Sequence, residues 1–229
     1  TCYAIGVVAA VHPLVSEAVS ELLADGKPVC GLISQLFATG HDNYVGPDNW
    51  KVGRNAAWFV DHACKLPGKI AIPVGNHRYR CQDMNESGFR SYFREYAPGF
   101  TILDPPSTFE SSDVARELVE KLLREVPDLA AIFVAGGGIT EVVTALRQNT
   151  KPGQVVLVGR QLMDVTRQAL LDGFMKLAIS TPMDVFARTT ISNMVSVLSN
   201  PDQGSQTAVI PFALHIRENI YAAKPTGNL

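Results

Sequence analysis

The sequence lacks the cysteine and histidine groupings that mark metal and disulfide chemistry. Its four cysteines form no CxxC pair and show no Cys/His ligand spacing: they are Cys2, Cys30, Cys64 and Cys81. Scattered cysteines of this kind are typical of reduced structural thiols in a cytoplasmic protein. We therefore expect a cytoplasmic location, no metal site and no disulfide framework.

Charge of one sign and long apolar runs are also scarce. The chain has 20 Lys and Arg against 22 Asp and Glu, a formal net charge of −2. Nucleic-acid phosphates need a concentrated basic face, so this chain is not expected to bind nucleic acid directly. No apolar run approaches the ~20 residues of a membrane span, and no signal peptide is visible. The composition predicts an ordinary globular protein with no membrane partner.

The sequence has no recognisable catalytic set. It lacks a nucleophile elbow and paired acids, and His12, His41 and His77 have no adjacent Ser/Asp or Cys arrangement. Neither GxxxxGK[ST] nor a GxGxxG with a downstream acid occurs. We therefore expect a protein that is not an enzyme and carries no cofactor.

What the sequence does have is a regular alternation of short apolar runs and amphipathic segments. That alternation predicts an α/β fold with a doubly wound, mostly parallel sheet. The predicted strands cover 4–10, 28–33, 44–46, 70–74, 100–103, 130–135, 155–158, 175–179 and 208–216. The predicted helices cover 14–25, about 48–66, 86–96, 114–126, 139–148, 165–171 and 185–198.

The stretch 68–89, GKIAIPVGNHRYRCQDMNESGF, shows how such a sheet would present a ligand site. Its apolar run breaks at Gly75, and Asp83 and Glu86 then form a potential capping box for a helix. Open α/β sheets bind ligands beyond the carboxyl ends of their strands. The intervening loop is therefore a candidate, although it can equally be a solvated basic loop; its candidate residues are Arg78, Tyr79 and Arg80.

Other strand ends supply further candidates. Ser34 and Gln35 follow the strand at 28–33. Asp48 and Asn49 precede a helix, where they can cap it or contact a ligand near a hinge. The string at 136–138 is all glycine and opens a helix; it could cradle an anion, but we favour a pocket floor that a ligand approaches closely.

Several motifs resemble, in order and spacing, the effector-binding domain of the lactose-repressor (LacI/GalR) family of transcriptional regulators. They include IGVVAAVHPLVSEAV, YVGPDNWKVGRNAAWFV, PGKIAIPVG, NESGFRSYF, VVLVGRQL and LLDGFMKLAIST. The resemblance implies a two-lobed, periplasmic-binding-protein-like (type I) fold in which each lobe is a parallel sheet flanked by helices. It implies an N-terminal lobe of 1–66 plus 183–198 and a C-terminal lobe of 67–182 plus 199–229.

The function implied by this resemblance is ligand sensing. A small sugar-like or polyol effector would bind in the interlobe cleft of a homodimeric repressor. Operator DNA would be contacted only through a DNA-binding domain, which has no counterpart here, and neither has the first part of the N-terminal lobe. We therefore expect exposed apolar faces and poor solubility for this chain alone. The alternative is a solute-binding protein of a sugar transporter.

The resemblance also points to particular ligand-binding positions. Asn85 stands where relatives usually have an arginine that grips sugar hydroxyls, and Gly136-Gly137 stands where many have Asn-Asp. Gln161 replaces a frequent Asp or Glu, and Thr181 replaces a frequent Gln. Asn keeps hydrogen-bonding capacity without the charge of Arg. The predicted pocket is therefore less charged than that of a typical sugar binder of this family.

Overall fold

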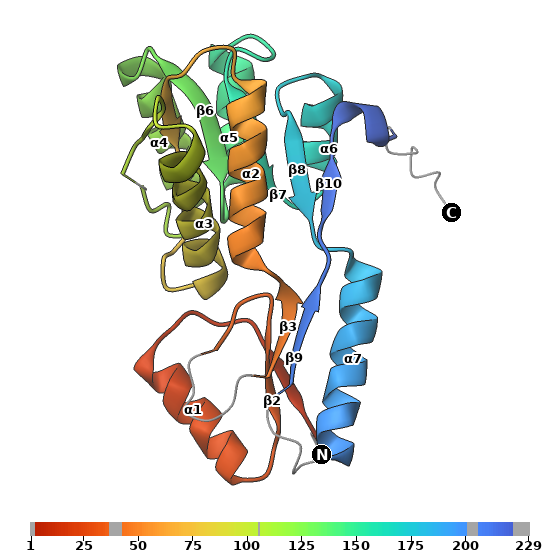
Figure 1. The fold of residues 1–229 in the computed structure, drawn as a ribbon. Coiled ribbons are helices and arrows are strands. Elements are labelled where there is room, and N and C mark those ends of the chain that lie inside the picture. The colour runs from red at the N-terminus through yellow and green to blue at the C-terminus, as the bar shows by residue number, and fades with distance from the viewer. Residues whose placement is uncertain (1–2, 37–42, 105, 201–205, 222–229) are drawn as a thin grey trace, which may run out of the picture. The chain divides into compact units, whose positions relative to one another are not determined.

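The computed structural model describes residues 3–36, 43–104, 106–200 and 206–221, and it divides into two compact units (Figure 1). Unit 1 contains Thr1–Asn49, His77–Met84 and Thr181–Phe212. Unit 2 contains Trp50–Asn76, Asn85–Ser180 and Ala213–Leu229. The chain therefore passes between the units several times.

Unit 1 is built on a four-stranded, fully parallel sheet. Its strand order is β1-β2-β3-β9, with β1 at Ile5–Val7, β2 at Val29–Leu32, β3 at Tyr44–Pro47 and β9 at Thr207–Ile210. Helices α1 (Pro13–Ala24) and α7 (Met183–Ser199) lie on either side of these strands in Figure 1. Its buried apolar cluster is small and centres on Cys30, Val45 and Ile210.

Unit 2 is built on a six-stranded sheet of order β10-β8-β7-β6-β4-β5. All pairs are parallel except β10–β8. The strands are β4 (Lys69–Ala71), β5 (Thr101–Ile102), β6 (Leu129–Val134), β7 (Val156–Arg160), β8 (Leu177–Ser180) and β10 (Ala213–His215). The helices are α2 (Asn49–Ala63), α3 (Arg80–Tyr96), α4 (Ser112–Glu125), α5 (Ile139–Asn149) and α6 (Asp164–Leu171), with a short 3-10 helix at Arg217–Asn219. The first residue of α2 and the first turn of α3 belong to unit 1.

The core of unit 2 is formed by strands that are buried on both faces, as parallel sheets require. Ile132, Phe133 and Leu157 are all fully buried. The rings of Phe133 and Phe89 stack with their centroids 5.1 Å apart, which joins α3 to β6. Phe89 and Phe93 on α3 are core residues, whereas Tyr96 at the end of this helix is 64% exposed.

Glycines set how closely α2 and α3 approach within unit 2. A methyl group on Gly53 would overlap with the carbonyl oxygen of Asn85 and lie 2.9 Å from the nitrogen of Phe89. A methyl group on Gly88 would overlap with the carbonyl oxygen of Trp50 and lie 3.2 Å from its Cα. These contacts are with backbone, which cannot rotate away as a side chain can. The two helices therefore need glycine at both positions.

The structure corrects the predicted start of α3. This helix begins at Arg80 rather than at residue 86, so Asp83 lies in its first turn and does not cap it. Asp83 Oδ2 instead accepts a hydrogen bond from Arg80 Nη1 at 2.9 Å. Glu86 Oε1 accepts one from Arg90 Nε at 2.7 Å. Pairs of opposite charge three and four residues apart stabilise a helix, which is why this polar stretch is helical.

The structure also differs from the predicted C-terminal strand and from the predicted lobes. Residues 208–216 form two strands: β9 pairs with β3 in unit 1, and β10 pairs with β8 in unit 2. Pro211 lies between them and has no N–H to donate to a sheet. Segment 199–212 therefore belongs to unit 1. Most of α2 belongs to unit 2, although it was assigned to the N-terminal lobe.

The cysteines that the structure describes are free thiols, as predicted; Cys2 lies outside the described residues. Burial raises the pKa of the Cys30 thiol to about 11. Burial, with the nearby Asp61 carboxylate, raises the pKa of the Cys64 thiol to about 11 as well. Protonated thiols of this kind are inert structural groups.

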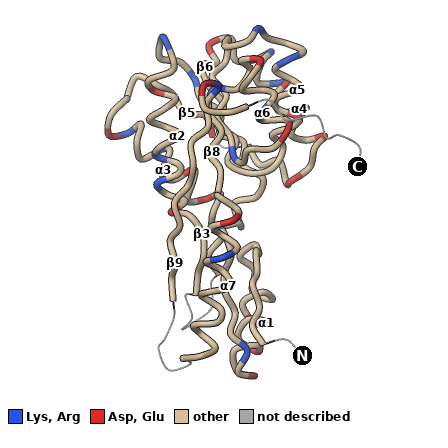
Figure 2. The backbone as a smooth tube through the Cα atoms, turned by 90° about the vertical axis from the view of Figure 1, so that its right-hand side faces the viewer, with Lys and Arg blue, Asp and Glu red and all other residues tan. Residues whose placement is uncertain are grey.

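Lys and Arg positions alternate with Asp and Glu positions along the backbone of unit 2 in the view of Figure 2. Within the described ranges, none of the helices is long and apolar enough to cross a membrane. The exposed apolar side chains of unit 1 include several on α7 and its surroundings: Met183, Ile191, Val195, Leu198 and Val209.

His215 is the last residue of β10, which is an edge strand of the unit 2 sheet. Its Nε2 lies 2.8 Å from the hydroxyl oxygen of Ser180 on the neighbouring strand β8. Burial of the imidazole lowers the pKa of His215 from its ordinary value of 6.5, and the positive charge of Arg167 lowers it further. The folded protein therefore binds a proton at His215 less readily than the unfolded chain does.

We predict that this histidine makes the protein less stable in acid. Because its pKa is lowered on folding, the associated stability is present above pH 6.5 and is lost as the pH falls below that value. The free energy of unfolding, measured by urea titration across this range, should decline less steeply with falling pH in His215→Gln than in the wild type. Equal slopes in the two proteins would contradict this assignment.

A second prediction concerns the α2–α3 contact. Gly→Ala inside a helix ordinarily stabilises by about 1 kcal/mol. Overpacking against backbone costs about 1–3 kcal/mol and should therefore prevail at Gly53 and Gly88. Gly53→Ala and Gly88→Ala should each lower the free energy of unfolding in a urea titration.

Gly99→Ala is the matched control for this pair. A methyl group there would make an ordinary contact, 3.4 Å from Pro67 Cγ. If Gly53→Ala and Gly88→Ala proved as stable as Gly99→Ala, the inference that the close approach of α2 and α3 requires glycine would be refuted.

Candidate functional site

Three neighbouring strands of unit 2 bring some of the candidate residues to one edge of the sheet. Strands β4, β6 and β7 are adjacent and parallel, so the segments that follow them meet at one edge of the sheet. Gly75 follows β4, the glycine string 136–138 follows β6, and Arg160 ends β7 with Gln161 behind it. The carboxyl edge of a parallel sheet is where α/β proteins bind ligands.

Asn85 is the central polar residue at this edge. It is 1% exposed, and its backbone is fixed where α3 packs against Gly53. Its Oδ1 accepts a long hydrogen bond, 3.4 Å, from Arg160 Nη1. Its Nδ2 is buried without a hydrogen-bond partner. A buried donor left unsatisfied costs about 1–3 kcal/mol, so a ligand oxygen that accepts from Asn85 would bind favourably.

Arg160 is a site residue that sequence reasoning missed, since attention fell on its neighbour Gln161. The guanidinium, half-buried at the end of β7, contacts Asn85, and the two residues form a pair of donors within unit 2. Gln161 has a left-handed backbone with φ of 66°, and its N–H donates to Ile179 O at 3.0 Å. In the sequence, Arg160 could have been recognised as a candidate only from its place at the end of a predicted strand; in the structure it is the last residue of β7.

The glycine string combines a left-handed residue with one that lies against a carboxylate. Gly138 has φ of 94° and stands at the N-cap of α5, a conformation that favours glycine. Gly136 and Gly137 are half-buried at the carboxyl edge. The Glu110 carboxylate lies directly against Gly137, where a methyl group would overlap with it. Nothing in the sequence pattern pointed to Glu110.

The N-terminal candidates belong to unit 1. Ser34 is fully buried, and its Oγ accepts a hydrogen bond from Cys81 N at 3.3 Å. Asn49 Nδ2 donates a hydrogen bond to Ile33 O at 2.8 Å. Ile33 has a left-handed backbone with φ of 61°, and this hydrogen bond stabilises it. Asn49 therefore ties the end of β2 to the start of α2. Gln35 is exposed, and Asp48 immediately precedes α2.

The basic loop candidates also belong to unit 1. Arg78 is exposed, and its carbonyl oxygen accepts from Val11 N at 2.7 Å. Tyr79 is half-buried, and its carbonyl oxygen accepts from Gln82 N at 2.9 Å at the start of α3. Arg80 is the first residue of α3 and pairs with Asp83.

The candidate set is therefore divided between the two units. Thr181 directly follows β8, is 2% exposed and clusters with unit 1. The candidates in unit 1 are Ser34, Gln35, Asp48, Asn49, Arg78, Tyr79, Arg80 and Thr181. Those in unit 2 are Asn85, Gly136, Gly137 and Gln161, and the structure adds Arg160 and Glu110 to them.

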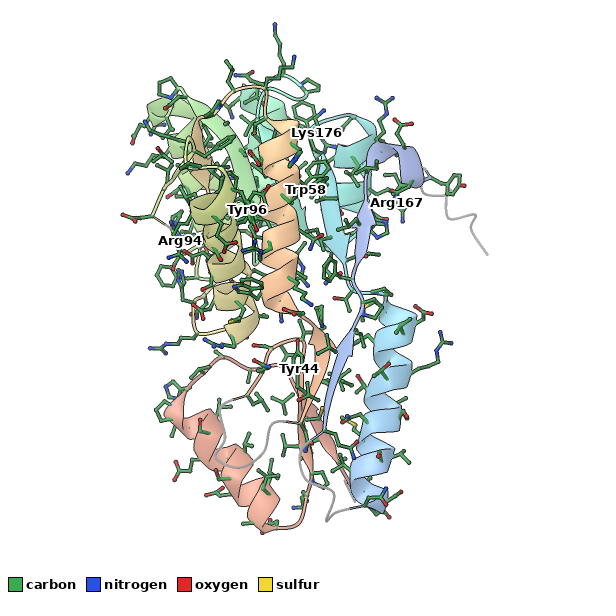
Figure 3. All side chains as sticks on the ribbon, viewed as in Figure 1. Tyr44, Trp58, Arg94, Tyr96, Arg167 and Lys176 are labelled. Atoms are coloured by element: carbon green, nitrogen blue, oxygen red, sulfur yellow. The ribbon has the colours of Figure 1, made fainter. Side chains whose placement is uncertain are left out.

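A separate groove of about 680 Å³ runs between α2 and α3 and contains none of these residues. Figure 3 shows Trp58 and Tyr96 along it. Arg54 lies over the Trp50 ring at 4.9 Å and donates to Glu95 Oε1 at 2.8 Å, so its charge is already matched. Over the described part of the chain, no group of three or more His, Cys, Asp or Glu side chains could hold a metal ion.

Solved structures with the same fold include three from bacterial sugar-binding proteins. An ABC transporter solute-binding protein from Burkholderia graminis C4D1M, in complex with D-arabinose, has a TM-score of 0.85 at 18% identity, covering 94% of this chain and 76% of that one. One from Actinobacillus succinogenes 130z with bound D-allose has a TM-score of 0.82 at 21% identity, covering 94% and 79%. GanP, a glucose-galactose binding protein from Geobacillus stearothermophilus, has a TM-score of 0.83 at 17% identity, covering 94% and 76%.

These likenesses confirm the predicted α/β, two-lobed periplasmic-binding-protein-like fold with parallel sheets flanked by helices. No curated protein matches the amino-acid sequence. The model of the "Periplasmic binding protein domain" family matches residues 2–202, which is most of the sequence. The chain therefore belongs to the periplasmic binding protein domain family.

Proposed function

We propose that this chain binds a small, polyhydroxylated ligand of the sugar or polyol class, using the carboxyl edge of the unit 2 sheet. The observation that carries the proposal is the buried amide of Asn85. Its Nδ2 has no hydrogen-bond partner, and its Oδ1 accepts a hydrogen bond from the Arg160 guanidinium. Sites built to hydrogen-bond a ligand hydroxyl keep such groups unsatisfied until the ligand arrives.

The chemistry of this edge supports a neutral ligand rather than an anion. Asn85 and Arg160 can donate hydrogen bonds, and Glu110 at the same edge can only accept them while it is ionised. Hydroxyl groups both donate and accept, so a polyol can use both kinds of partner. The similar proteins named above are described with D-arabinose, D-allose and glucose or galactose, and these sugars define the first probes.

For the biological role, we favour a solute-binding protein that delivers a sugar to a transporter. This is supported by structural neighbours that are ABC transporter solute-binding proteins, including one with D-tagatose and one with D-fucose. The regulator role that the lactose-repressor resemblance implied, with a homodimer, operator DNA and a cytoplasmic location, remains a prediction. A homodimer in analytical ultracentrifugation would favour the regulator; a monomer would favour the transport role.

The proposal predicts stabilisation by neutral sugars. A ligand present at about 100 times its Kd adds about 2.7 kcal/mol to the free energy of unfolding. At least one of D-arabinose, D-allose, D-galactose, D-fucose and D-tagatose should therefore raise the unfolding temperature in a thermal-shift assay and release or absorb heat in calorimetry. If none of the five did so in either assay, sugar binding at this site would be refuted.

A second prediction separates binding from stability at Asn85. Leucine has a similar size and no polar group, so Asn85→Leu removes the unsatisfied Nδ2 together with the ligand's hydrogen-bond partner. The free energy of unfolding without ligand should change little in Asn85→Leu, because the gain from removing the unsatisfied Nδ2 is offset by the loss of Oδ1, which accepts the long hydrogen bond from Arg160. The Kd for the best sugar of the panel should rise about tenfold or more, as expected for the loss of a buried hydrogen bond.

Asn55→Leu is the matched control, because Asn55 lies on α2 in the other groove and its Nδ2 donates to Lys51 O at 2.9 Å. This variant should bind the sugar as the wild type does. An Asn85→Leu protein with wild-type affinity would remove Asn85 from the site.

A further inference from the structure

The loop between β5 and α4 is docked onto the end of β4 in unit 2. Val74 N donates to Pro106 O at 3.1 Å, and Thr108 N donates to Val74 O at 2.8 Å. These two bonds form a parallel bridge between Val74 and Ser107. The loop therefore continues the sheet alongside β4 and reaches the carboxyl edge at a fixed place.

The turn that follows this bridge has an unusual backbone. Phe109 and Glu110 have φ values of 53° and 57°, so two consecutive residues other than glycine are left-handed. Each such residue costs roughly 1–2 kcal/mol for an L-amino acid. Strain of this kind persists only where surrounding contacts fix it, and it is found preferentially at ligand-binding sites. Ser111 N closes the turn by donating to Thr108 O at 2.9 Å.

The turn directs the Glu110 carboxylate between the ends of two neighbouring strands. Methyl groups on Gly75, after β4, or on Gly137, after β6, would overlap with its oxygens. Neither glycine has a left-handed φ, so the effect of a side chain at either position would be to displace the Glu110 carboxylate. Gly137 also lies just before α5, where the helix dipole favours a negative charge. The glycine string thus accommodates a carboxylate that the chain itself supplies.

The same edge contains buried polar groups that point to a ligand. Thr108 is 1% exposed and its Oγ1 has no hydrogen-bond partner, two residues before Glu110. Asn85 Nδ2 is likewise buried and unsatisfied. Position 161 at the same edge is a glutamine, whose amide is neutral. Asn85 and Arg160 supply hydrogen-bond donors there, and Glu110 supplies a carboxylate.

We propose that Glu110 is a ligand-binding and specificity-determining residue whose carboxylate, placed between Gly75 and Gly137, accepts hydrogen bonds from hydroxyl groups of the bound sugar. This rests on the proposed function and extends it by naming the acceptor. A carboxylate accepts strong, charge-assisted hydrogen bonds from hydroxyl groups and repels anions. The site should therefore select neutral sugars over uronic acids and sugar phosphates.

The test compares Glu110→Gln with the wild type by calorimetry, using the neutral sugar of the panel that binds the wild type best. Glutamine keeps the shape and removes the charge. Because hydrogen bonds to charged groups contribute about 1.5–3 kcal/mol, the Kd should rise about ten- to hundredfold. The corresponding uronic acid should bind the wild type more weakly than the neutral sugar, and this preference should shrink in Glu110→Gln.

Gly137→Ala tests the placement of the carboxylate without changing its charge. Its methyl group would push the carboxylate aside, so the Kd should rise as in Glu110→Gln, whereas Gly99→Ala should leave it unchanged. Far-ultraviolet circular dichroism checks that each variant is folded. Wild-type affinity in either Glu110→Gln or Gly137→Ala would overturn the assignment while leaving sugar binding intact. A wild-type protein that binds no sugar would remove both proposals.

Discussion

The central strands of unit 2, β7, β6 and β4, run parallel and are buried on both faces. Their apolar side chains leave no place for polar groups within the sheet, because a buried polar group without a partner costs free energy. Polar chemistry is thus confined to the edges, and parallel pairing brings several strand ends to the same edge. Gly75, Gly137 and Arg160 are neighbours for this reason, although they are far apart in the sequence.

Close packing then fixes the groups at that edge. The glycine contacts between α2 and α3 hold the backbone of Asn85, and the bridge between Val74 and Ser107 holds the loop that carries Glu110. A neutral amide, a guanidinium and a carboxylate together suit a ligand rich in hydroxyl groups. The arrangement positions donors and an acceptor, which is the property of a binding site that is largely formed before its ligand arrives.

Much of the fold could be predicted because strand and helix patterns are local. The alternation of apolar runs predicted nearly every element, and the motifs predicted the fold family. The split of 208–216 into β9 and β10 could not be read from periodicity, since each half continues the same apolar pattern. The helical start at Arg80 depends on side-chain pairs such as Arg80–Asp83, which the loop-like composition concealed.

The candidate site was predictable only where residues directly follow a strand. The glycine string was found in this way and Asn85 through the family resemblance. The role of the glycines was not predicted, because it depends on Glu110 from another loop. Glu110 reaches the edge through a turn in which Phe109 and Glu110 are left-handed. Such a turn is usually predicted from a glycine or asparagine, and neither residue type occurs at these two positions. Contacts between segments distant in sequence are set by tertiary packing, and single-sequence reasoning does not reach them.

A crystal structure grown with a neutral sugar would show whether the carboxyl edge of the unit 2 sheet binds the ligand. We expect electron density for the sugar at the carboxyl edge of β4, β6 and β7, with ring or hydroxyl oxygens accepting from Asn85 Nδ2 and hydroxyl groups donating to Glu110. Density for the sugar in the α2–α3 groove beside Trp58, with Asn85 Nδ2 still lacking a partner, would contradict it.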